Sequence, residues 1–151
     1  MNAFGLNEVS ESVVILENNG FFPDVAIAEF QNQFHQVSEI DHEKVKSQLI
    51  NSMIEINHDL DTLKQKAVVT TLAEMNSEKV AGQNILESHY HRAVFSHAKA
   101  KLMPIILDVM TKDKADALET NREQLMNEYM GISSQAVRVL LGMKSATVYM
   151  I

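Results

Sequence analysis

The chain has 151 residues, a length that suits a single domain built around one hydrophobic core. Its 46% hydrophobic content is normal for a globular protein, and with 5 glycines and 2 prolines we expect long uninterrupted helices. Zero cysteines exclude disulfides, thiolate metal sites and cysteine nucleophiles. No apolar run approaches the roughly 18 residues of a membrane span, and residues 1–15 lack the basic start of a signal peptide, so we expect no membrane partner.

The net charge of −7 is placed unevenly along the chain. Residues 1–43 hold eight acidic side chains and no lysine or arginine, whereas the remainder, with 12 acids against 13 bases, is nearly neutral. Proteins that grip the phosphate backbone usually present a basic stripe, and none is visible in this sequence. Tight DNA binding by a single subunit is therefore not expected.

Residues 1–20 contain one short apolar run, Val13 to Leu16, which is set among polar residues and followed by the turn-forming Asn18-Asn19-Gly20. We interpret them as an extended N-terminal arm, either mobile in the free protein or ordered by a neighbouring chain. The alternative is an acidic, solvated tail with no role.

The first two helices are predicted between Pro23 and Ala67. Pro23 suits the first turn of a short helix that runs to about Phe34. After it, Ser38 or Asp41 provides the N-cap of a helix from about residue 41 to 67. Apolar residues follow this second helix at alternating steps of four and three, which predicts a core-facing stripe; Ile50 and Ile54 widen it enough to pack on two neighbours. The stripe consists of Val45, Leu49, Met53, Ile56, Leu60, Leu63 and Ala67.

Two more helices are predicted in the second half of the chain. Asn76 or Ser77 would cap the third, with Gly82 as a weak point, and Pro104 should end, restart or kink it. The last would run from Lys114 to about Leu141, with a bend or break near Gly131 and a stop at Gly142. Its inward-facing residues are predicted to be Leu118, Leu125, Tyr129, Ile132, Ala136 and Leu140. The expected fold is therefore an all-α bundle of about four helices over residues 21–144.

Residues 145–151 change period and favour a strand or an extended tail. The segment Thr147, Val148, Tyr149, Met150 and Ile151 ends the chain in apolar side chains that water would solvate poorly. Such a tail either folds back onto its own helices or docks into a partner, for example by strand addition.

Few residues in this sequence support metal binding or catalysis. Glu55 and His58 match the Glu-x-x-His spacing of di-iron bundles, but the only other copy of this motif, Glu39 to His42, straddles a predicted helix start. Glu55 and His58 also lie largely off the apolar stripe, so a solvated helix face is favoured. His89 and His91 point about 200° apart on a helix and cannot share a metal ion. No nucleophile elbow, P-loop or dinucleotide fingerprint is present, so we expect neither an enzyme nor a bound cofactor.

Four blocks of sequence, in this order, resemble the L-type head completion proteins of contractile-tailed temperate phages. They are Phe21-Phe22-Pro23-Asp24, then Met53-x-Glu55-x-Asn57-x-Asp59-Leu60, then Tyr90-x-Arg92-Ala93-Val94 with Ala98, Ala100 and Leu102, and finally a weaker set of Lys114-Ala115-Asp116, Ala136-Val137-Arg138 and Ile151. The resemblance spans about residues 21–151. Pro104 and Gly131 depart from it, because the family pattern continues helically there.

The resemblance implies a structural virion protein that completes DNA-filled heads at the head-tail neck, after a period in the host cytoplasm during assembly. By analogy with other helical adaptors, its copies would form a ring under the portal protein, with twelve as the expected number. A tail-terminator or second connector protein would bind the ring, and packaged DNA would pass through it without sequence-specific binding.

Two groups of residues are predicted to make contacts between proteins. The tail Thr147–Ile151 is expected to dock on the portal or on a neighbouring subunit, and Phe21, Phe22, Tyr90 and Arg92 are candidate inter-subunit contacts. The runner-up hypothesis is a metal-binding helical bundle that uses Glu55 and His58. A third, a DNA-binding regulator with Gly131 in a helix-turn-helix, lacks bases other than Arg138 near the expected recognition helix.

Overall fold

The computed structural model describes residues 14–109, 114, 116 and 121–142. The all-α prediction is confirmed, because these residues are mostly helical and contain only two short antiparallel strand pairs. The helices are α2 (Ile27–Gln33), α3 (His42–Asp59), α4 (Asp61–Lys66), α5 (Leu72–Met75), α6 (Ile85–Val109) and α8 (Arg122–Leu140), with a 3-10 turn η1 at His35–Glu39. The strands are β1 (Ile15–Leu16), β2 (Val25–Ala26), β3 (Lys79–Val80) and β4 (Gln83–Asn84).

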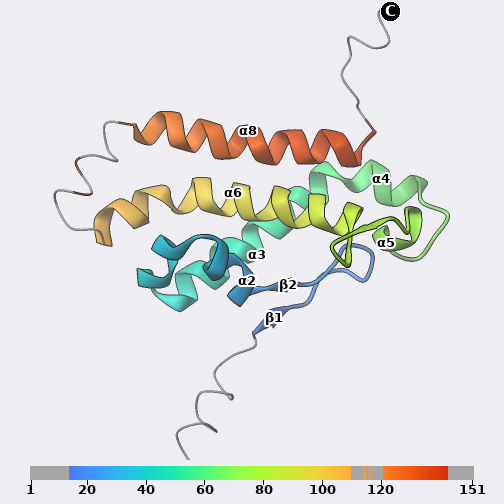
Figure 1. The fold of residues 1–151 in the computed structure, drawn as a ribbon, viewed down its shortest axis with the longest axis horizontal. Helices are drawn as coiled ribbons and strands as arrows, with labels where there is room; N and C mark the ends of the chain where they lie inside the picture. The colour runs from blue at the N-terminus through green and yellow to red at the C-terminus, as the bar shows by residue number, and fades with distance from the viewer. Residues whose placement is uncertain (1–13, 110–113, 115, 117–120, 143–151) are drawn as a thin grey trace, which may run out of the picture.

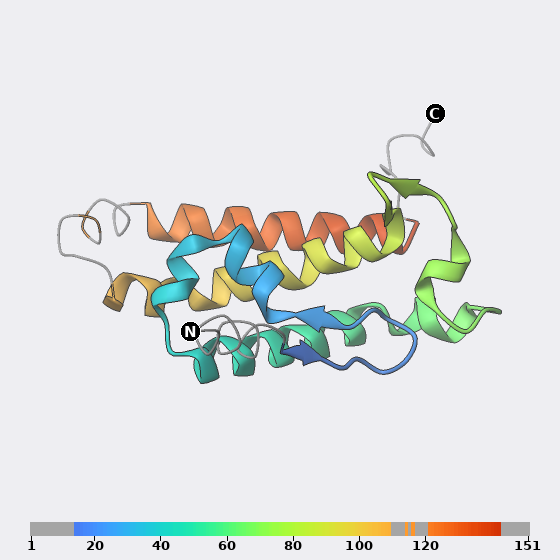
Figure 2. The ribbon, with the colours of Figure 1, turned by 60° about the horizontal axis from the view of Figure 1, so that its bottom comes forward.

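Helix α6 lies at the centre of the bundle. The antiparallel α8 packs along one side of it and makes the most extensive contact between any two elements, while α3 packs on another side (Figure 1). Small side chains let α6 and α8 approach closely: Ala93 and Ala136 are buried, and the Ser133 hydroxyl donates a 2.7 Å hydrogen bond to the Ala93 carbonyl. Helix α2 and the β1–β2 hairpin cover α6 and α3 (Figure 2).

The chain from Val14 to Gly20 is packed onto the domain. Strand β1 pairs with β2, so that Ile15 lies opposite Ala26 and Leu16 opposite Val25, and the Leu16 side chain is buried. Residues 1–13 of the predicted arm lie outside the described residues. This pairing also corrects the start of the first helix: because Val25 and Ala26 are extended, α2 begins at Ile27 and not at Pro23.

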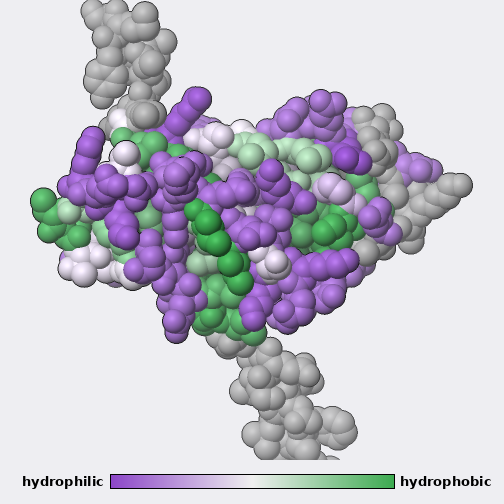
Figure 3. Space-filling view, turned by 180° about the vertical axis from the view of Figure 1, so that it is seen from behind, coloured by the Kyte–Doolittle hydropathy of each residue, from purple (hydrophilic) through white to green (hydrophobic). Residues whose placement is uncertain are grey.

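The long second helix is largely as predicted, and its N-cap is Asp41, whose side chain accepts a hydrogen bond from the Glu43 amide. The predicted stripe is buried from Val45 to Leu60, but the helix breaks at Leu60 and resumes as α4. Ile50 and Ile54, which were expected to pack on a second neighbour, are 38% and 60% exposed, so the described residues do not enclose them. Hydrophobic patches lie between polar side chains on the face opposite to that of Figure 1 (Figure 3).

The predicted start of the third helix is wrong. Residues 79–84 form the β3–β4 hairpin, and its turn places Ala81 and Gly82 at φ +52° and +78°, a pair of positive values typical of tight hairpins. Helix α6 therefore begins at Ile85. Asn84 caps it, because its side-chain oxygen accepts hydrogen bonds from the amides of Leu86 and Glu87.

Neither of the last two helices ends at the position where an interruption was predicted. Helix α6 continues through Pro104 to Val109, flanked by buried Met103 and Ile106, whose packing offsets the cost of a proline inside a helix. Helix α8 is continuous through Gly131. The stop at Gly142 is confirmed, since this residue has φ +72° and its amide donates to the Val139 carbonyl. The predicted tail lies outside the described residues.

Candidate functional site

The structure separates the four predicted contact residues into core and surface. Phe21, Phe22 and Tyr90 are 6%, 3% and 0% exposed, so their side chains are enclosed by the chain's own core. Arg92, two positions after Tyr90 on α6, is exposed. Of these four side chains, Arg92 is therefore the one that lies on the surface.

Three of the four blocks that carry the family resemblance meet at Tyr90. Its ring stacks on Phe22, with the ring centroids 5.1 Å apart, and its hydroxyl donates a 2.6 Å hydrogen bond to Oδ1 of Asn57. Asn18 completes a closed network: its Nδ2 donates to the Tyr90 hydroxyl, and its Oδ1 accepts from Nδ2 of Asn57, each at 2.8 Å. Burial raises the pKa of Tyr90 far above its ordinary value, so the hydroxyl stays protonated. This network fastens the N-terminal hairpin to α3 and α6.

The predicted Glu55–His58 pair does not form a metal site. Within the described ranges no three His, Cys, Asp or Glu side chains come together in a way that could hold a metal ion. Glu55 instead pairs with the buried His97, whose Nε2 lies 2.7 Å from Oε2 of Glu55, while His58 lies exposed on the same helix. The metal-binding alternative therefore loses its ligand set.

His97 also links α6 to α3 through Ser52, whose Oγ lies 2.7 Å from Nδ1 of His97. A serine that contacts a histidine, which in turn contacts a carboxylate, is typical of nucleophilic catalysis. A catalytic serine, however, must be accessible to its substrate. Ser52 is 0% exposed and lies inside the bundle, and its Oγ also accepts from Gln48. The arrangement is a structural link that satisfies buried polar groups.

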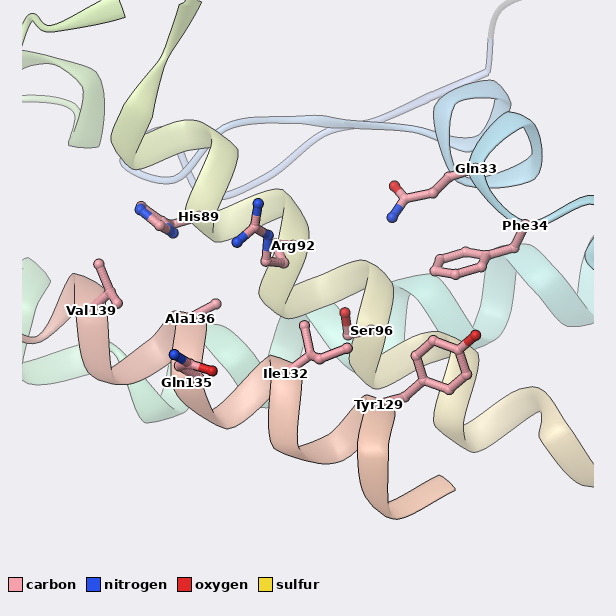
Figure 4. Close-up of a pocket in the computed structure, with 10 residues that line it drawn as sticks. All are labelled: Gln33, Phe34, His89, Arg92, Ser96, Tyr129, Ile132, Gln135, Ala136 and Val139. Carbon is pink, nitrogen blue, oxygen red and sulfur yellow. The ribbon is translucent and has the colours of Figure 1, made fainter. Parts of the chain in front are cut away.

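A surface groove runs between α6 and α8 and is bounded at one end by the end of α2 (Figure 4). We call it the α6–α8 groove; its volume is about 450 Å³. Polar groups of α6 face apolar side chains of α8 across it, and an aromatic pair stands at one end. The residues that line it are Gln33, Phe34, His89, Arg92, Ser96, Tyr129, Ile132, Gln135, Ala136 and Val139.

The groove is positively charged and partly apolar, although the whole chain is acidic. None of the described residues that line it carries a carboxylate, and Arg92 forms no ion pair within the part of the chain that the structure describes. Burial lowers the pKa of His89, and the positive charge of Arg92 lowers it further, so His89 is mainly neutral at pH 7. Arg92 is therefore the permanent charge of the groove, and Ile132 and Val139 provide exposed apolar surface at 41% and 45%.

A second cation lies beyond the aromatic end of the groove. Nζ of Lys99 is 5.0 Å from the centroid of the Phe34 ring and 6.0 Å from that of Tyr129. Burial lowers the pKa of Lys99 to about 8. The two rings also contact each other edge to face, at a centroid distance of 5.7 Å, which holds the end of α2 against α8.

Arg92 was predicted from the sequence as a contact residue, but the other residues of this groove were not predicted to form a site with it. Ile132 was placed in the inward stripe of the last helix, whereas Val139 was assigned to no face. These two residues are seven positions apart and therefore lie on one side of a helix, about 10 Å from each other. That spacing indicates a second row of apolar side chains on α8, next to the row that faces the core. The sequence of α8 alone does not show that α6 leaves this second row exposed.

Comparisons with known proteins agree over nearly the whole chain. A family model described as "Phage head completion protein (GPL)" matches residues 16–151. The chain is 28% identical over 142 residues to a protein described as "Probable head completion/stabilization protein" from Haemophilus phage HP1 (strain HP1c1), with 91% of this chain and 92% of that protein covered. No solved structure matches. None of the helices in the described residues has the length and apolar character of a membrane span.

Proposed function

Because this chain belongs to the phage head completion protein family (GPL), we propose that it is a non-enzymatic virion subunit that forms a ring adaptor between the portal and the tail components. The observation that carries this proposal is the family match over residues 16–151, which includes α2 to α8 and every residue of the α6–α8 groove. The similar protein of phage HP1 is named for head completion or stabilization, which supports the same role here.

The partners in this proposal are the portal protein, neighbouring copies of the chain and a tail-terminator or second connector protein. Twelve copies would surround the channel at the head-tail neck, each contacting the next head to tail so that the ring closes by rotation. Subunits would gather in the host cytoplasm before they join a filled head. The tail Thr147–Ile151 would dock on the portal or on an adjacent copy, and exposed Arg92 would serve as a contact between proteins.

The charge of the chain supports passage of DNA through such a ring. A conduit has to release its cargo, and a net charge of −7 disfavours tight binding to phosphates at short range. Proteins that grip DNA present clustered bases, whereas the α6–α8 groove of this chain holds a single arginine and no lysine. Sequence-specific DNA binding is therefore not part of the proposal.

Imaging of the purified protein with its portal tests the proposal directly. Negative-stain electron microscopy should show an added ring on the portal, and a phage lacking the gene should accumulate heads that do not join tails. The proposal fails if no ring forms and head-tail joining is normal in the deletion phage. A chain lacking Thr147–Ile151 should bind the portal more weakly while its helical circular dichroism is retained, because the helical domain ends before the tail.

A further inference from the structure

Helix α3 carries an exposed apolar pair beside a fixed carboxylate. Ile50 and Ile54 are four positions apart, so they lie on one side of the helix, and the described residues enclose neither of them. The next residue, Glu55, has a side chain that is 59% exposed, and the contact of its Oε2 with Nε2 of the buried His97 holds the carboxylate in place. We call Ile50, Ile54 and Glu55 the α3 face. A partner that covers this face would remove poorly solvated side chains from water.

The α6–α8 groove has the complementary composition. Its wall on α8 presents the exposed Ile132 and Val139, and its wall on α6 presents the guanidinium of Arg92, with no carboxylate among the described residues that line it. Apolar side chains can therefore meet apolar side chains while Glu55 meets Arg92. We propose, on the basis of the ring proposed above, that the α3 face of one copy packs into the α6–α8 groove of a neighbouring copy.

The spacing of the two apolar pairs allows them to interdigitate. Ile132 and Val139 are seven positions apart, about 10 Å along α8, whereas Ile50 and Ile54 are about 6 Å apart along α3. The isoleucines of α3 can therefore enter between the two side chains of α8, as the ridges of one helix enter the grooves of another. An apolar helix face that lies in a groove is a recurring mode of recognition between proteins.

The charges along α3 support the pairing of Glu55 with Arg92. The two lysines of this helix, Lys44 and Lys46, lie at least nine positions before Glu55, which is about 13 Å along the helix axis. At physiological ionic strength exposed charges are screened beyond about 8 Å, so these lysines do not cancel the attraction between Glu55 and Arg92. The carboxylate is already held by His97, so little side-chain entropy is lost when a guanidinium binds it.

The two surfaces lie on different sides of the subunit. Helix α8 packs on one side of α6 and α3 on another, and α3 lies behind α6 when the groove faces the viewer (Figure 4). The buried Leu49 and Ile56 fix α3 in its own core, so the α3 face cannot turn into the groove of the same copy. A contact between two different surfaces repeats head to tail and closes into a ring by rotation. One such contact would cover both exposed apolar pairs in every copy.

Cross-linking between copies tests the assignment and does not require a portal. Because the chain has no cysteine, Ile54→Cys on one copy and Val139→Cys on a differently tagged copy can be joined by a short bismaleimide, which tolerates errors of register that the strict geometry of a disulfide does not. In a concentrated mixture a cross-link between the two tags is expected. Val68→Cys, at a fully exposed residue outside both surfaces, replaces Ile54→Cys in the matched control and should give no cross-link above background.

Three results would overturn the inference. One is the absence of the cross-link both in concentrated solution and in rings on the portal. Another is a cross-link between two Ile54→Cys copies, which would show that α3 packs on itself across a two-fold axis. The third is protection of Ile54→Cys from maleimide in dilute protein while Val68→Cys reacts, because another part of the same chain would then cover the α3 face.

Substitution of the charged pair tests the contact in more detail. Arg92→Gln and Glu55→Gln should each weaken the concentration-dependent association measured by sedimentation velocity about threefold, and the double variant should associate no more weakly than either single variant. Glutamine at position 55 keeps an acceptor for Nε2 of His97, so the link inside the subunit is retained. Arg138→Gln, at an exposed arginine of α8 outside the groove, should leave association unchanged. Additive losses in the double variant would contradict the pairing.

Failure of this inference and failure of the proposed function give different results. A ring on the portal whose copies show no cross-link from Ile54→Cys to Val139→Cys retains the adaptor function and rejects the contact assigned to α3. A cross-link in solution without any ring on the portal supports the contact and rejects the ring.

Discussion

The hydroxyl of Tyr90 donates a 2.6 Å hydrogen bond to Oδ1 of Asn57, 33 positions earlier in the chain. Through Asn18 the same hydroxyl is connected to the N-terminal hairpin, and through its ring Tyr90 stacks on Phe22. One fully buried side chain thus joins three segments that are distant in sequence. The residues that most resemble the family therefore stabilise the fold.

Replacement of Tyr90 by Phe should lower the free energy of unfolding by about 1–3 kcal/mol, because Oδ1 of Asn57 would lose its buried donor. Urea denaturation followed by circular dichroism measures the loss. Tyr129→Phe is the matched control: for the Tyr129 hydroxyl no hydrogen bond is found within the described residues, so its removal should cost less than about 0.5 kcal/mol. Equal effects of the two substitutions would contradict the role assigned to the network.

Ser52→Ala should destabilise the fold by about 1–2 kcal/mol, since Nδ1 of the buried His97 would lose its partner. The same substitution at exposed Ser47, five positions earlier on α3, should have little effect. A double-mutant cycle with Glu55→Gln, measured by thermal unfolding, reports whether the two ends of the His97 imidazole are coupled. A neutral Ser52→Ala variant would show that the link between α3 and α6 contributes nothing.

Lys99 should make stability depend on pH in the alkaline range. Its pKa is about 8 in the folded protein and near 10.5 in the unfolded chain, because burial disfavours the ammonium form. Between these values the unfolded state holds the extra proton, so the free energy of unfolding rises with pH. From pH 7 to 9.5 the free energy of unfolding should rise by about 2 kcal/mol more in the wild-type protein than in Lys99→Met. Urea denaturation at each pH measures this difference. Lys101→Met, at an exposed position, should keep the wild-type slope, and parallel curves for all three proteins would refute the effect.

Gly131→Ala should stabilise the protein by about 0.5–1 kcal/mol, because the residue lies inside a continuous helix and nothing lies within 4 Å of an added Cβ. The expected readout is a melting temperature a few degrees higher. Gly142→Ala is the comparison variant. An added Cβ at Gly142 also meets nothing within 4 Å, but the backbone angle φ of +72° strains any residue with a Cβ, so the free energy of unfolding should fall by about 1 kcal/mol. A destabilised Gly131→Ala variant would indicate that α8 needs flexibility at this point.

The accuracy of the sequence predictions depended on how local the deciding interaction is. The stripe on α3, Asp41 as one of two candidate caps and the stop at Gly142 were predicted because each depends on residues within one or two turns. The start of α6 was missed because a hairpin with Ala81 in a positive-φ turn is not favoured by local preference. Helices α6 and α8 do not end at Pro104 and Gly131, since packing between helices outweighs a local cost of about 1–3 kcal/mol.

The sequence by itself determined the helical character of the chain, the absence of cysteine chemistry and the apolar end at Ile151, because these are properties of composition and of spacing within one segment. Only the tertiary structure decided that Tyr90 is enclosed while Arg92, two residues later, faces a groove with Ile132 and Val139. Periodicity shows which side chains share a helix face. Whether that face is covered depends on how closely a second helix approaches, and that distance is set by the small side chains of both helices together.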